Sequence, residues 1–283
     1  LCGLAMGKLG GAELNYSSDV DIVGVCDDET AAEDRSVLES LMARVHQDLS
    51  RHTQAGLAYR VDLRLRPYGA AGSLVYPLAT LAAYYGRAEL WEIQALLKVR
   101  PVAGNREVGE RFLQSVAPLL RLRRSWEIIT DSIRTMRDRM VQQTAGAGLG
   151  TRDIKTGPGG LRDVEFLVQG LQLRHAAEHP ELVEGNTLRA LARLQELGVL
   201  PEGEAAQLRA DYIFLRRVEH CLQILEDRQI HAIPEDPAQL EALARRLLGP
   251  TADAARFLGV LAECQERIRH AYARRLLEGH RTV

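Results

Sequence analysis

One stretch near the start of the chain, residues 6–23, most constrains what this sequence can fold into. It reads MGKLGGAELNYSSDVDIV, a glycine-rich turn followed by a Ser-Asp-Val-Asp segment that enters an apolar run. Alternate side chains of a strand share one face, so Asp19 and Asp21 are expected to point the same way. Two adjacent carboxylates repel each other unless a cation or a proton lies between them. Magnesium, which takes oxygen ligands and shares them with phosphate, is the expected cation.

A second stretch, residues 57–67, adds a third carboxylate and several arginines. Its apolar residues alternate with Arg60, Asp62, Arg64 and Arg66, and this period of two predicts a strand. On this stretch alone, a solvated outer strand face is an equally good interpretation. Beside a Ser-Asp-x-Asp strand, the pattern favours Asp62 as a third metal ligand. The arginines would then bind phosphate, because a guanidinium presents a fixed fork of donors to phosphate oxygens.

The combination of the two stretches is more specific than either part. Gly-Gly pairs and Asp-x-Asp segments are common in turns. Three carboxylates brought to one cleft, however, match the ligands of a two-magnesium nucleotidyl-transfer centre. The sequence therefore predicts Asp19, Asp21 and Asp62 as catalytic residues and as metal ligands. The alternative is that these acids only cap turns or lie on the surface.

A third segment, residues 153–166, is a glycine loop that opens a helix. Its backbone N–H groups around Gly159 and Gly160 would form an anion site at the helix N-terminus, with Lys155 and Arg162 adding positive charge. It is not a Walker loop, because no Gly-Lys-Ser/Thr follows the glycines. Simple capping of the helix is the alternative interpretation.

Hydrophobic periodicity separates the chain into a mixed part and a helical part. Up to about residue 120, apolar runs typical of strands alternate with helical patterns, and every later periodic segment is helical. We therefore expect an α+β protein with a small mixed-sheet domain over residues 1–120 and an all-helical bundle domain over residues 121–283. A helix is expected over residues 31–51. Its predicted buried face consists of Val37, Leu38, Leu41, Met42, Val45 and Leu49.

Composition bears on which partners the chain has and on where in the cell it is found. The net charge of −2 and the low aromatic content give no sign of a nucleic-acid partner. Four scattered cysteines, without metal-site spacing, are typical of reduced thiols in a cytoplasmic protein. No apolar run approaches the length of a membrane span. The chain opens inside a strand-like run, so we expect it to be a piece of a longer polypeptide.

Together, these motifs resemble a known family. The segments are GKLGGAELNYSSDVD from Gly7, YRVDLRLRP from Tyr59, WEIQALLKVR from Trp91, KTGPGGLRDVEF from Lys155 and LRRVEH from Leu215. They resemble the bacterial glutamine synthetase adenylyltransferase family, which belongs to the DNA-polymerase-β-like nucleotidyltransferase superfamily. The resemblance covers nearly the whole chain, and it implies a polymerase-β-like first domain.

The resemblance implies a reaction and its participants. Members of the family have two similar halves. One half transfers AMP from ATP to a tyrosine of glutamine synthetase, and the other removes it with inorganic phosphate, giving ADP. This chain corresponds to one half. The segment Asn15–Ser18 and the region from Val218 to Pro234 look more like the AMP-removing half. The transferring half, another nucleotidyltransferase such as a uridylyltransferase or a tRNA-modifying enzyme, and a degenerate nucleotide sensor remain alternatives.

The resemblance also assigns roles to residues. It implies that Asp19 and Asp21 bind Mg2+ and that Asp62 holds a metal or orients the attacking oxygen. Glutamine synthetase would be the protein partner, and a nitrogen-signalling regulatory protein is left open as a second partner. The residues expected to contact nucleotide or phosphate are Gly10, Gly11, Ser18, Arg64, Arg66, Lys155, Gly159, Gly160 and Arg162.

Overall fold

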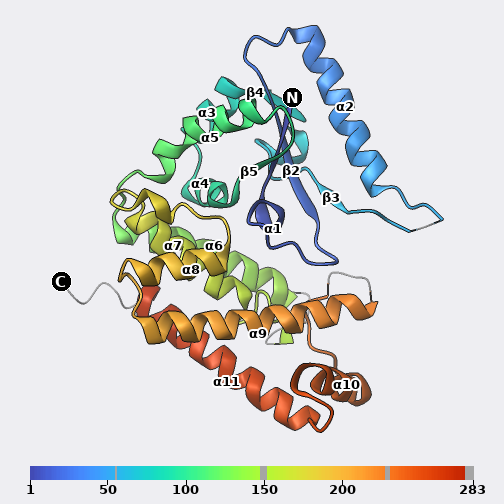
Figure 1. The fold of residues 1–283 in the computed structure, drawn as a ribbon, viewed down its shortest axis with the longest axis vertical. Coiled ribbons are helices and arrows are strands. Elements are labelled where there is room, and N and C mark those ends of the chain that lie inside the picture. Colours follow the sequence, from blue (N-terminus) through green and yellow to red (C-terminus); the bar gives the residue numbers. More distant parts are fainter. Residues whose placement is uncertain (55, 147–151, 227–229, 278–283) are drawn as a thin grey trace. The chain divides into compact units, whose positions relative to one another are not determined.

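The computed structural model describes residues 1–54, 56–146, 152–226 and 230–277, and these residues form two compact units. The first unit comprises Leu1–Leu122 with Ala176–Asn186, and the second comprises Arg123–His175 with Thr187–Val283. Figure 1 labels the helices and strands of both units along the ribbon. The first contains a small mixed sheet with helices and the second is helical, so the predicted α+β class is confirmed. The return of residues 176–186 to the first unit had no signal in the sequence.

The sheet of the first unit is organised around one central strand. β2 (Val20–Cys26) pairs antiparallel with β1 (Cys2–Ala5), and β1 pairs antiparallel with β5 (Arg100–Gly104). On its other side β2 pairs in parallel with two short strands, first β3 (Val61–Asp62) and then β4 (Val75–Pro77). All four residues of β1 are buried, as an apolar run in the middle of a sheet should be.

The helices of this unit cover the sheet and close its turns. α1 (Gly7–Gly10) follows β1, and α2 (Ala32–Ser50) follows β2. Later in the chain come α3 (Leu78–Tyr85), α4 (Leu90–Ala95) and α5 (Arg106–Leu120). α3 and α5 pack against each other and against β2. Their contact buries Tyr85 against Phe112, with ring centroids 6.1 Å apart.

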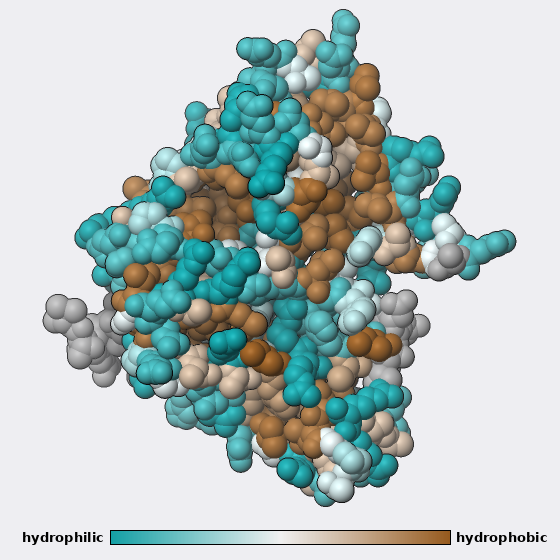
Figure 2. All heavy atoms as spheres, in the orientation of Figure 1, coloured by the Kyte–Doolittle hydropathy of each residue, from teal (hydrophilic) through white to brown (hydrophobic). Residues whose placement is uncertain are grey.

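The helix over residues 31–51 forms as predicted, but half of the six residues of its expected buried face are exposed. Only Met42 is buried, packed against Cys26 and Val75. Val37, Leu41 and Val45 are 64%, 50% and 39% exposed, and apolar surface is visible along α2 in Figure 2. The predicted buried face is therefore only partly covered, at Met42 and Leu38. The reason is that α2 meets the sheet at β3 and β4, which are too short to cover a helix of 19 residues.

One strand prediction also needs correction, and one strand was not predicted. The strand expected over residues 57–67 is limited to Val61–Asp62, because the chain turns at Arg64 and Leu65. Its expected apolar face stays open, with Tyr59 48% and Leu65 40% exposed. The edge strand β5 was not predicted at all. It contains Pro101, which lacks a backbone donor and is tolerated in strands mainly at edges.

The regular secondary structure among the described residues of the second unit is helical, apart from one isolated bridge between Asp153 and Ala232. Its helices are α6 (Trp126–Gly146), α7 (Leu161–His175), α8 (Thr187–Glu196), α9 (Glu202–Glu226), α10 (Pro237–Leu248) and α11 (Ala254–Tyr272). A π-helical turn, Ala273–Leu277, follows α11. α7 contacts α6, α8, α9 and α11, and it is buried on nearly every side. A helix in that position is apolar all round in most proteins, yet α7 carries Asp163 and Glu165 inside the unit. Among the described helices, none is long and apolar enough to cross a membrane.

We expect Gly10→Ala to destabilise the first unit. A Cβ at this position would overlap the carbonyl oxygen of Lys98, which is backbone and cannot rotate away. Overpacking of this kind costs about 1–3 kcal/mol or more of the free energy of unfolding. Urea unfolding, followed by hydrogen exchange in β1 and β2, measures the loss. Gly86→Ala is the matched control, because its Cβ would meet only ordinary contacts of 3.4 Å and 3.6 Å. Equal stability of both variants would contradict the packing argument.

Candidate functional site

The three predicted carboxylates lie on two neighbouring parallel strands of the first unit. Asp21 on β2 is directly opposite Asp62 on β3, one residue along from the Val20–Val61 pair. Paired residues of a parallel ladder point to the same face of the sheet. Asp19 precedes β2 by one residue and shares the face of Asp21 by the period of two. Tertiary structure thus brings together two acids that are 41 residues apart in the sequence.

Two arginines already neutralise part of this acidic charge. The Arg60 guanidinium donates to Asp19 Oδ1 at 3.1 Å and also to the carbonyl oxygen of Ser17. Arg64 holds Asp62 in a bidentate grip, with Nε at 3.0 Å from both carboxylate oxygens and Nη2 at 2.6 Å from Oδ2. The hydrogen bonds from Arg64 lower the pKa of the Asp62 carboxyl despite its partial burial. The pKa of Arg64 is raised in turn, chiefly by Asp62 and further by Asp19 and Asp21. The carboxyl of Asp62 is therefore ionised at neutral pH.

Arg66 has a different position from the one expected. Its guanidinium donates to three backbone carbonyl oxygens, those of Leu63, Ala70 and Gly72, at 2.5, 3.0 and 2.9 Å. It thereby ties together the loop that follows Asp62. The structure groups Arg60 and Arg64 with the acids, whereas Arg66 braces backbone. Sequence alternation could not separate these roles, because all three arginines share one phase of the pattern.

The glycine turn before β2 is tightly packed backbone. The N–H groups of Gly10 and Gly11 donate to the carbonyl oxygens of Met6 and Gly7, so both are already used within α1. Arg100 donates to the carbonyl oxygen of Gly10, and Asn186 donates to that of Gly11. The need for glycine at both positions follows from close backbone approach. Residue 10 abuts the carbonyl oxygen of Lys98, and residue 11 abuts that of Gly185.

Three residues that the predicted site left out also shape it. Gly7 has a φ of +54°, which favours glycine, and a Cβ there would overlap the Oδ2 of Asp21 in its present conformation. Lys98 forms an ion pair of 2.5 Å with Glu13, and both side chains are nearly buried. Gly7, Glu13 and Lys98 belong to the motifs seen in the sequence, but no sequence pattern indicated that they pack around the glycine turn.

Ser18 forms part of the turn that leads into β2. Its hydroxyl oxygen accepts from the N–H of Asn15 at 3.3 Å, and its own N–H donates to the carbonyl oxygen of Asn15 at 3.4 Å. Asn15 and Ser17 are buried, while Tyr16 between them is 77% exposed. The turn therefore fixes the direction in which Asp19 enters the site.

The donor set suits magnesium bound together with a phosphate. Carboxylate oxygens are the ligands that Mg2+ prefers, and it commonly takes one or two carboxylates and completes its shell with water and substrate phosphate. Among the described residues, no three His, Cys, Asp or Glu side chains are arranged as a metal-binding group. Asp19 and Asp62 are instead turned toward Arg60 and Arg64. The Asp21–Asp62 pair is thus compatible with a shared magnesium, and the structure contains no preassembled three-carboxylate cage in its described part.

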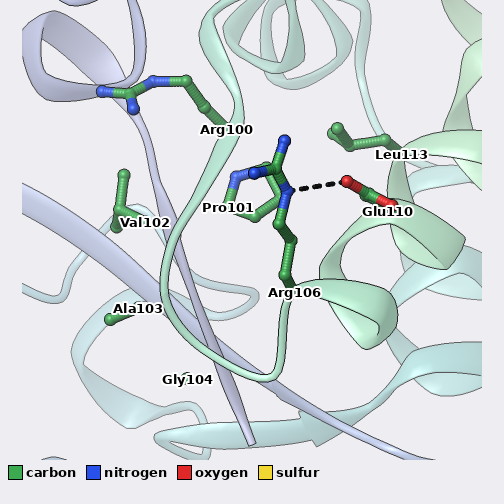
Figure 3. A pocket seen from close by; sticks show the side chains of 8 residues that line it. All are labelled: Arg100, Pro101, Val102, Ala103, Gly104, Arg106, Glu110 and Leu113. Atoms are coloured by element: carbon green, nitrogen blue, oxygen red, sulfur yellow. Dashed lines mark hydrogen bonds and ion pairs between the residues drawn. The ribbon is translucent and has the colours of Figure 1, made fainter.

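One pocket of the first unit lies away from these acids. It has a volume of about 520 Å³ and lies between β5 and the start of α5 (Figure 3). Arg106 reaches toward Glu110 there, and their ion pair is 2.8 Å long. Arg100 points away from that pair, toward the carbonyl oxygens of Leu9 and Gly10. None of the three predicted acids lines this pocket.

The glycine loop of the second unit is closed by its own carboxylates. Asp153 Oδ1 accepts from the N–H groups of Lys155 and Thr156, each at 2.8 Å. Asp163 Oδ2 accepts from the N–H of Gly159 at 2.7 Å, and the N–H of Gly160 donates to the carbonyl oxygen of Gly157. Arg137 holds Asp163 from the other side at 2.6 and 2.9 Å. The donors expected to form an anion site therefore already have acceptors.

Lys155 and Arg162 lie in a buried polar network of the same unit. Lys155 Nζ is 3.4 Å from Nε2 of His231, whose Nδ1 is 3.2 Å from the buried Glu219. Arg162 donates to Glu165 at 2.8 Å. Burial lowers the pKa of the Lys155 ammonium, and the positive charge of Arg162 lowers it further. The structure therefore brings the two predicted cations close together, and it attaches both to internal partners.

Two family models match this chain. Residues 1–115 match the model described as glutamate-ammonia ligase adenylyltransferase. Residues 129–276 match the model described as GlnD PII-uridylyltransferase. The first match contains all three predicted acids and the second contains the glycine loop, so each unit of the chain carries one of the two matches over most of its length.

Three similar curated relatives carry the name bifunctional glutamine synthetase adenylyltransferase/adenylyl-removing enzyme. The protein from Streptomyces avermitilis is 41% identical over 251 residues, which are 87% of this chain and 25% of the relative. That from Mycobacterium tuberculosis is 43% identical over 244 residues, 86% of this chain and 23% of the relative. The protein from Hahella chejuensis is 39% identical over 249 residues, which are 85% of this chain and 26% of the relative. The chain thus spans about a quarter of the length of these relatives.

We expect Arg64→Gln to raise the pKa of Asp62 from its lowered position toward the ordinary range of an aspartate. The substitution removes the hydrogen bonds that lower this pKa in the folded state. In the wild type, the stabilisation from the lowered pKa is present above the unfolded-state pKa and is lost as the pH falls through the folded-state value. Carbon-13 NMR titration of the carboxyl carbons measures the shift. Arg44→Gln, which removes an exposed pair with Asp48, serves as the control. An unchanged titration of Asp62 in Arg64→Gln would refute the assigned cause.

Proposed function

The chain belongs to the glutamate-ammonia ligase adenylyltransferase family, and on that premise we propose that it is a magnesium-dependent nucleotidyltransferase acting on a tyrosine of glutamine synthetase. The direction we propose is AMP removal, in which inorganic phosphate and the adenylylated tyrosine give ADP and free tyrosine. Because the chain spans about a quarter of its relatives, this proposal assigns to it one of the two activities in their name.

The observation that carries the proposal is the pairing of Asp21 with Asp62 across β2 and β3. Nucleotidyl transfer needs closely placed carboxylates to hold magnesium against a phosphate. The register supplies two of them on one face, and Asp19 extends the same row. Arg60 and Arg64 bring two guanidinium groups to the edge of that row.

The proposed chemistry is one substitution at phosphorus. An oxygen of inorganic phosphate forms a bond to the AMP phosphorus as the bond from phosphorus to the tyrosine oxygen breaks, and the departing phenolate takes up a proton. Magnesium held by Asp19, Asp21 and Asp62 would neutralise charge on the phosphate oxygens. Such reactions depend mainly on positioning and on charge neutralisation. Arg64 is suited to neutralising charge on the phosphate. Its side chain is 74% exposed, and Asp62 engages two of its three nitrogens, Nε and Nη2.

The other predicted phosphate contacts differ in the support they receive. Ser18 lies beside Asp19 in the turn, and its hydroxyl can still donate while it accepts from Asn15. We keep Ser18 as a proposed phosphate contact beside these acids. Lys155 and Arg162, which have partners inside the second unit, stay predictions for the glycine loop of that unit alone. The remaining predicted contacts have donors that already serve the fold. They are Gly10, Gly11, Arg66, Gly159 and Gly160.

The direction of transfer rests on a short sequence feature. The segment Asn15–Ser18 resembles the AMP-removing half of the family more than the transferring half. In the structure this segment is the turn that aims Asp19, with Tyr16 exposed at its tip. The alternative direction, transfer of AMP from ATP with release of pyrophosphate, uses the same acids at the same phosphorus. The two directions differ in the attacking group, which must therefore be tested directly.

UMP transfer is a second candidate, because residues 129–276 match the GlnD PII-uridylyltransferase model. The predicted acids, however, lie within the match to the adenylyltransferase model. A nucleotide sensor without turnover is a third candidate, and the three intact carboxylates oppose it. We further propose a cytoplasmic setting, with glutamine synthetase as the protein partner and without a nucleic-acid or membrane partner.

We expect Asp19→Asn combined with Asp21→Asn to abolish AMP transfer in both directions while leaving the fold intact. The two carboxylates are only half-buried and are not part of the apolar core, and amides bind magnesium poorly compared with carboxylates. The assay mixes the chain with adenylylated glutamine synthetase, phosphate and Mg2+ and measures ADP. Circular dichroism checks the fold. Asp34→Asn, an exposed acid at the start of α2, is the matched control and should keep full activity.

The same assay separates the candidate functions. ADP release by the wild type supports AMP removal, whereas incorporation of AMP from ATP would identify the transferring half. UMP incorporation from UTP would favour the second candidate. Full magnesium-dependent activity in the double variant would refute the assignment of the metal ligands.

A further inference from the structure

Tyr68 has an unusual combination of backbone conformation and exposure. Its φ is +62° and its ψ is +12°, in the left-handed region that a residue with a Cβ seldom occupies. Among the described residues, Ala12 is the only other non-glycine residue with a positive φ. The Tyr68 side chain is 73% exposed, so core packing does not explain why a large aromatic residue is found here. Strained residues that the surroundings hold in place are found most often at functional sites.

The loop around Tyr68 is braced from inside. Arg66 donates to the carbonyl oxygens of Leu63, Ala70 and Gly72, which spans the loop on both sides of Tyr68. The hydroxyl of Tyr76 donates to the carbonyl oxygen of Pro67 at 3.0 Å. These bonds fix the backbone on which the exposed ring is carried.

A second tyrosine supports the ring itself. The Tyr68 and Tyr84 rings meet edge to face, with centroids 5.4 Å apart and an interplanar angle of 68°. Tyr84 is held by a hydrogen bond from its hydroxyl to Glu92, and its pKa is raised to about 12 by burial and by that carboxylate. An edge-to-face contact orients Tyr68 and leaves most of its surface in solvent.

The braced loop starts at the candidate site. Asp62 precedes it directly, and Arg64 within it grips Asp62. The loop then folds back, so that a Cβ at Gly69 would be 3.8 Å from the carbonyl oxygen of Arg64. Tyr68 is therefore next in sequence to Gly69, a position at which an added Cβ would come within van der Waals distance of the Arg64 backbone. One sugar separates the base of a nucleotide from its phosphate, so a base can reach past the acids to a neighbouring loop.

We propose that Tyr68 is the platform on which the base of the nucleotide stacks. This inference rests on the proposed function and deepens it, because it assigns a base subsite to the same site. Every nucleobase has a π-face that can stack on an aromatic side chain, and a purine offers the larger face. The subsite would hold the adenine of AMP in either direction of transfer. A stacking role would explain why position 68 carries a tyrosine despite its positive φ. The next residue also has a positive φ, and it is a glycine, Gly69.

Calorimetric binding of ADP and of pyrophosphate to the full chain with Mg2+ tests the proposal. Tyr68→Asn removes the ring but suits the left-handed backbone, since asparagine tolerates that region. It should weaken ADP binding roughly tenfold or more, as expected for the loss of one base–aromatic stack, and leave pyrophosphate binding unchanged. Tyr68→Phe should bind ADP within about twofold of the wild type, because it keeps the stacking face.

Tyr59→Asn is the matched control, because it removes another exposed tyrosine, 48% exposed, outside the braced loop. It should bind both ligands as the wild type does. Unchanged ADP binding in Tyr68→Asn would overturn the inference and leave the proposed function standing. Equal loss of ADP and pyrophosphate would also overturn it, because it would mean that Tyr68 only maintains the loop. A wild-type chain that binds no ADP would overturn the proposed function together with the inference.

Discussion

The register between β2 and β3 is the constraint on which the candidate site depends. A shift of one residue would turn Asp62 to the opposite face of the sheet and separate it from Asp21. A ladder of only two pairs could not fix this register alone. The N–H of Val20 donates to the carbonyl oxygen of Arg60 at 2.7 Å, and the Arg60 side chain reaches back to Asp19. One arginine thus joins the two segments at the backbone and at the carboxylates, and the same contacts that align the strands also neutralise the acids.

The two units handle buried charge in different ways. In the second unit the carboxylates of Asp153 and Asp163 accept hydrogen bonds from the glycine loop, and Asp163 also pairs with Arg137. Buried acids of this kind stabilise only when each has partners, and here the partners are backbone donors and a guanidinium. In the first unit, Asp19 and Asp62 lie at the sheet edge beside solvent-accessible arginines. That difference in exposure is why we assign the chemistry to the first unit.

Close packing accounts for several residues that look like ligand contacts in the sequence. Gly10 and Gly11 are glycine because other backbone segments approach them, and Gly7 leaves space for the carboxylate of Asp21. Arg66 resembles a phosphate-binding residue, yet it holds a loop in one conformation. These positions can still matter for activity, since they set where the acids and the exposed ring of Tyr68 lie. Their effect on catalysis would pass through geometry rather than through contact with the nucleotide.

The sequence by itself determined the α+β class, the helical second part, and the presence of three acids in motifs that resemble one family. Periodicity and short motifs are local properties, so they can be recognised in the sequence without knowledge of the fold. Tertiary structure decided which arginines join the acids, that residues 57–67 form only a two-residue strand, and that α2 leaves Val37, Leu41 and Val45 in solvent. It also decided that the donors of the glycine loop at Gly159 are already occupied. Those outcomes depend on partners far away in the chain, and no local pattern records how much surface or how many donors those partners offer.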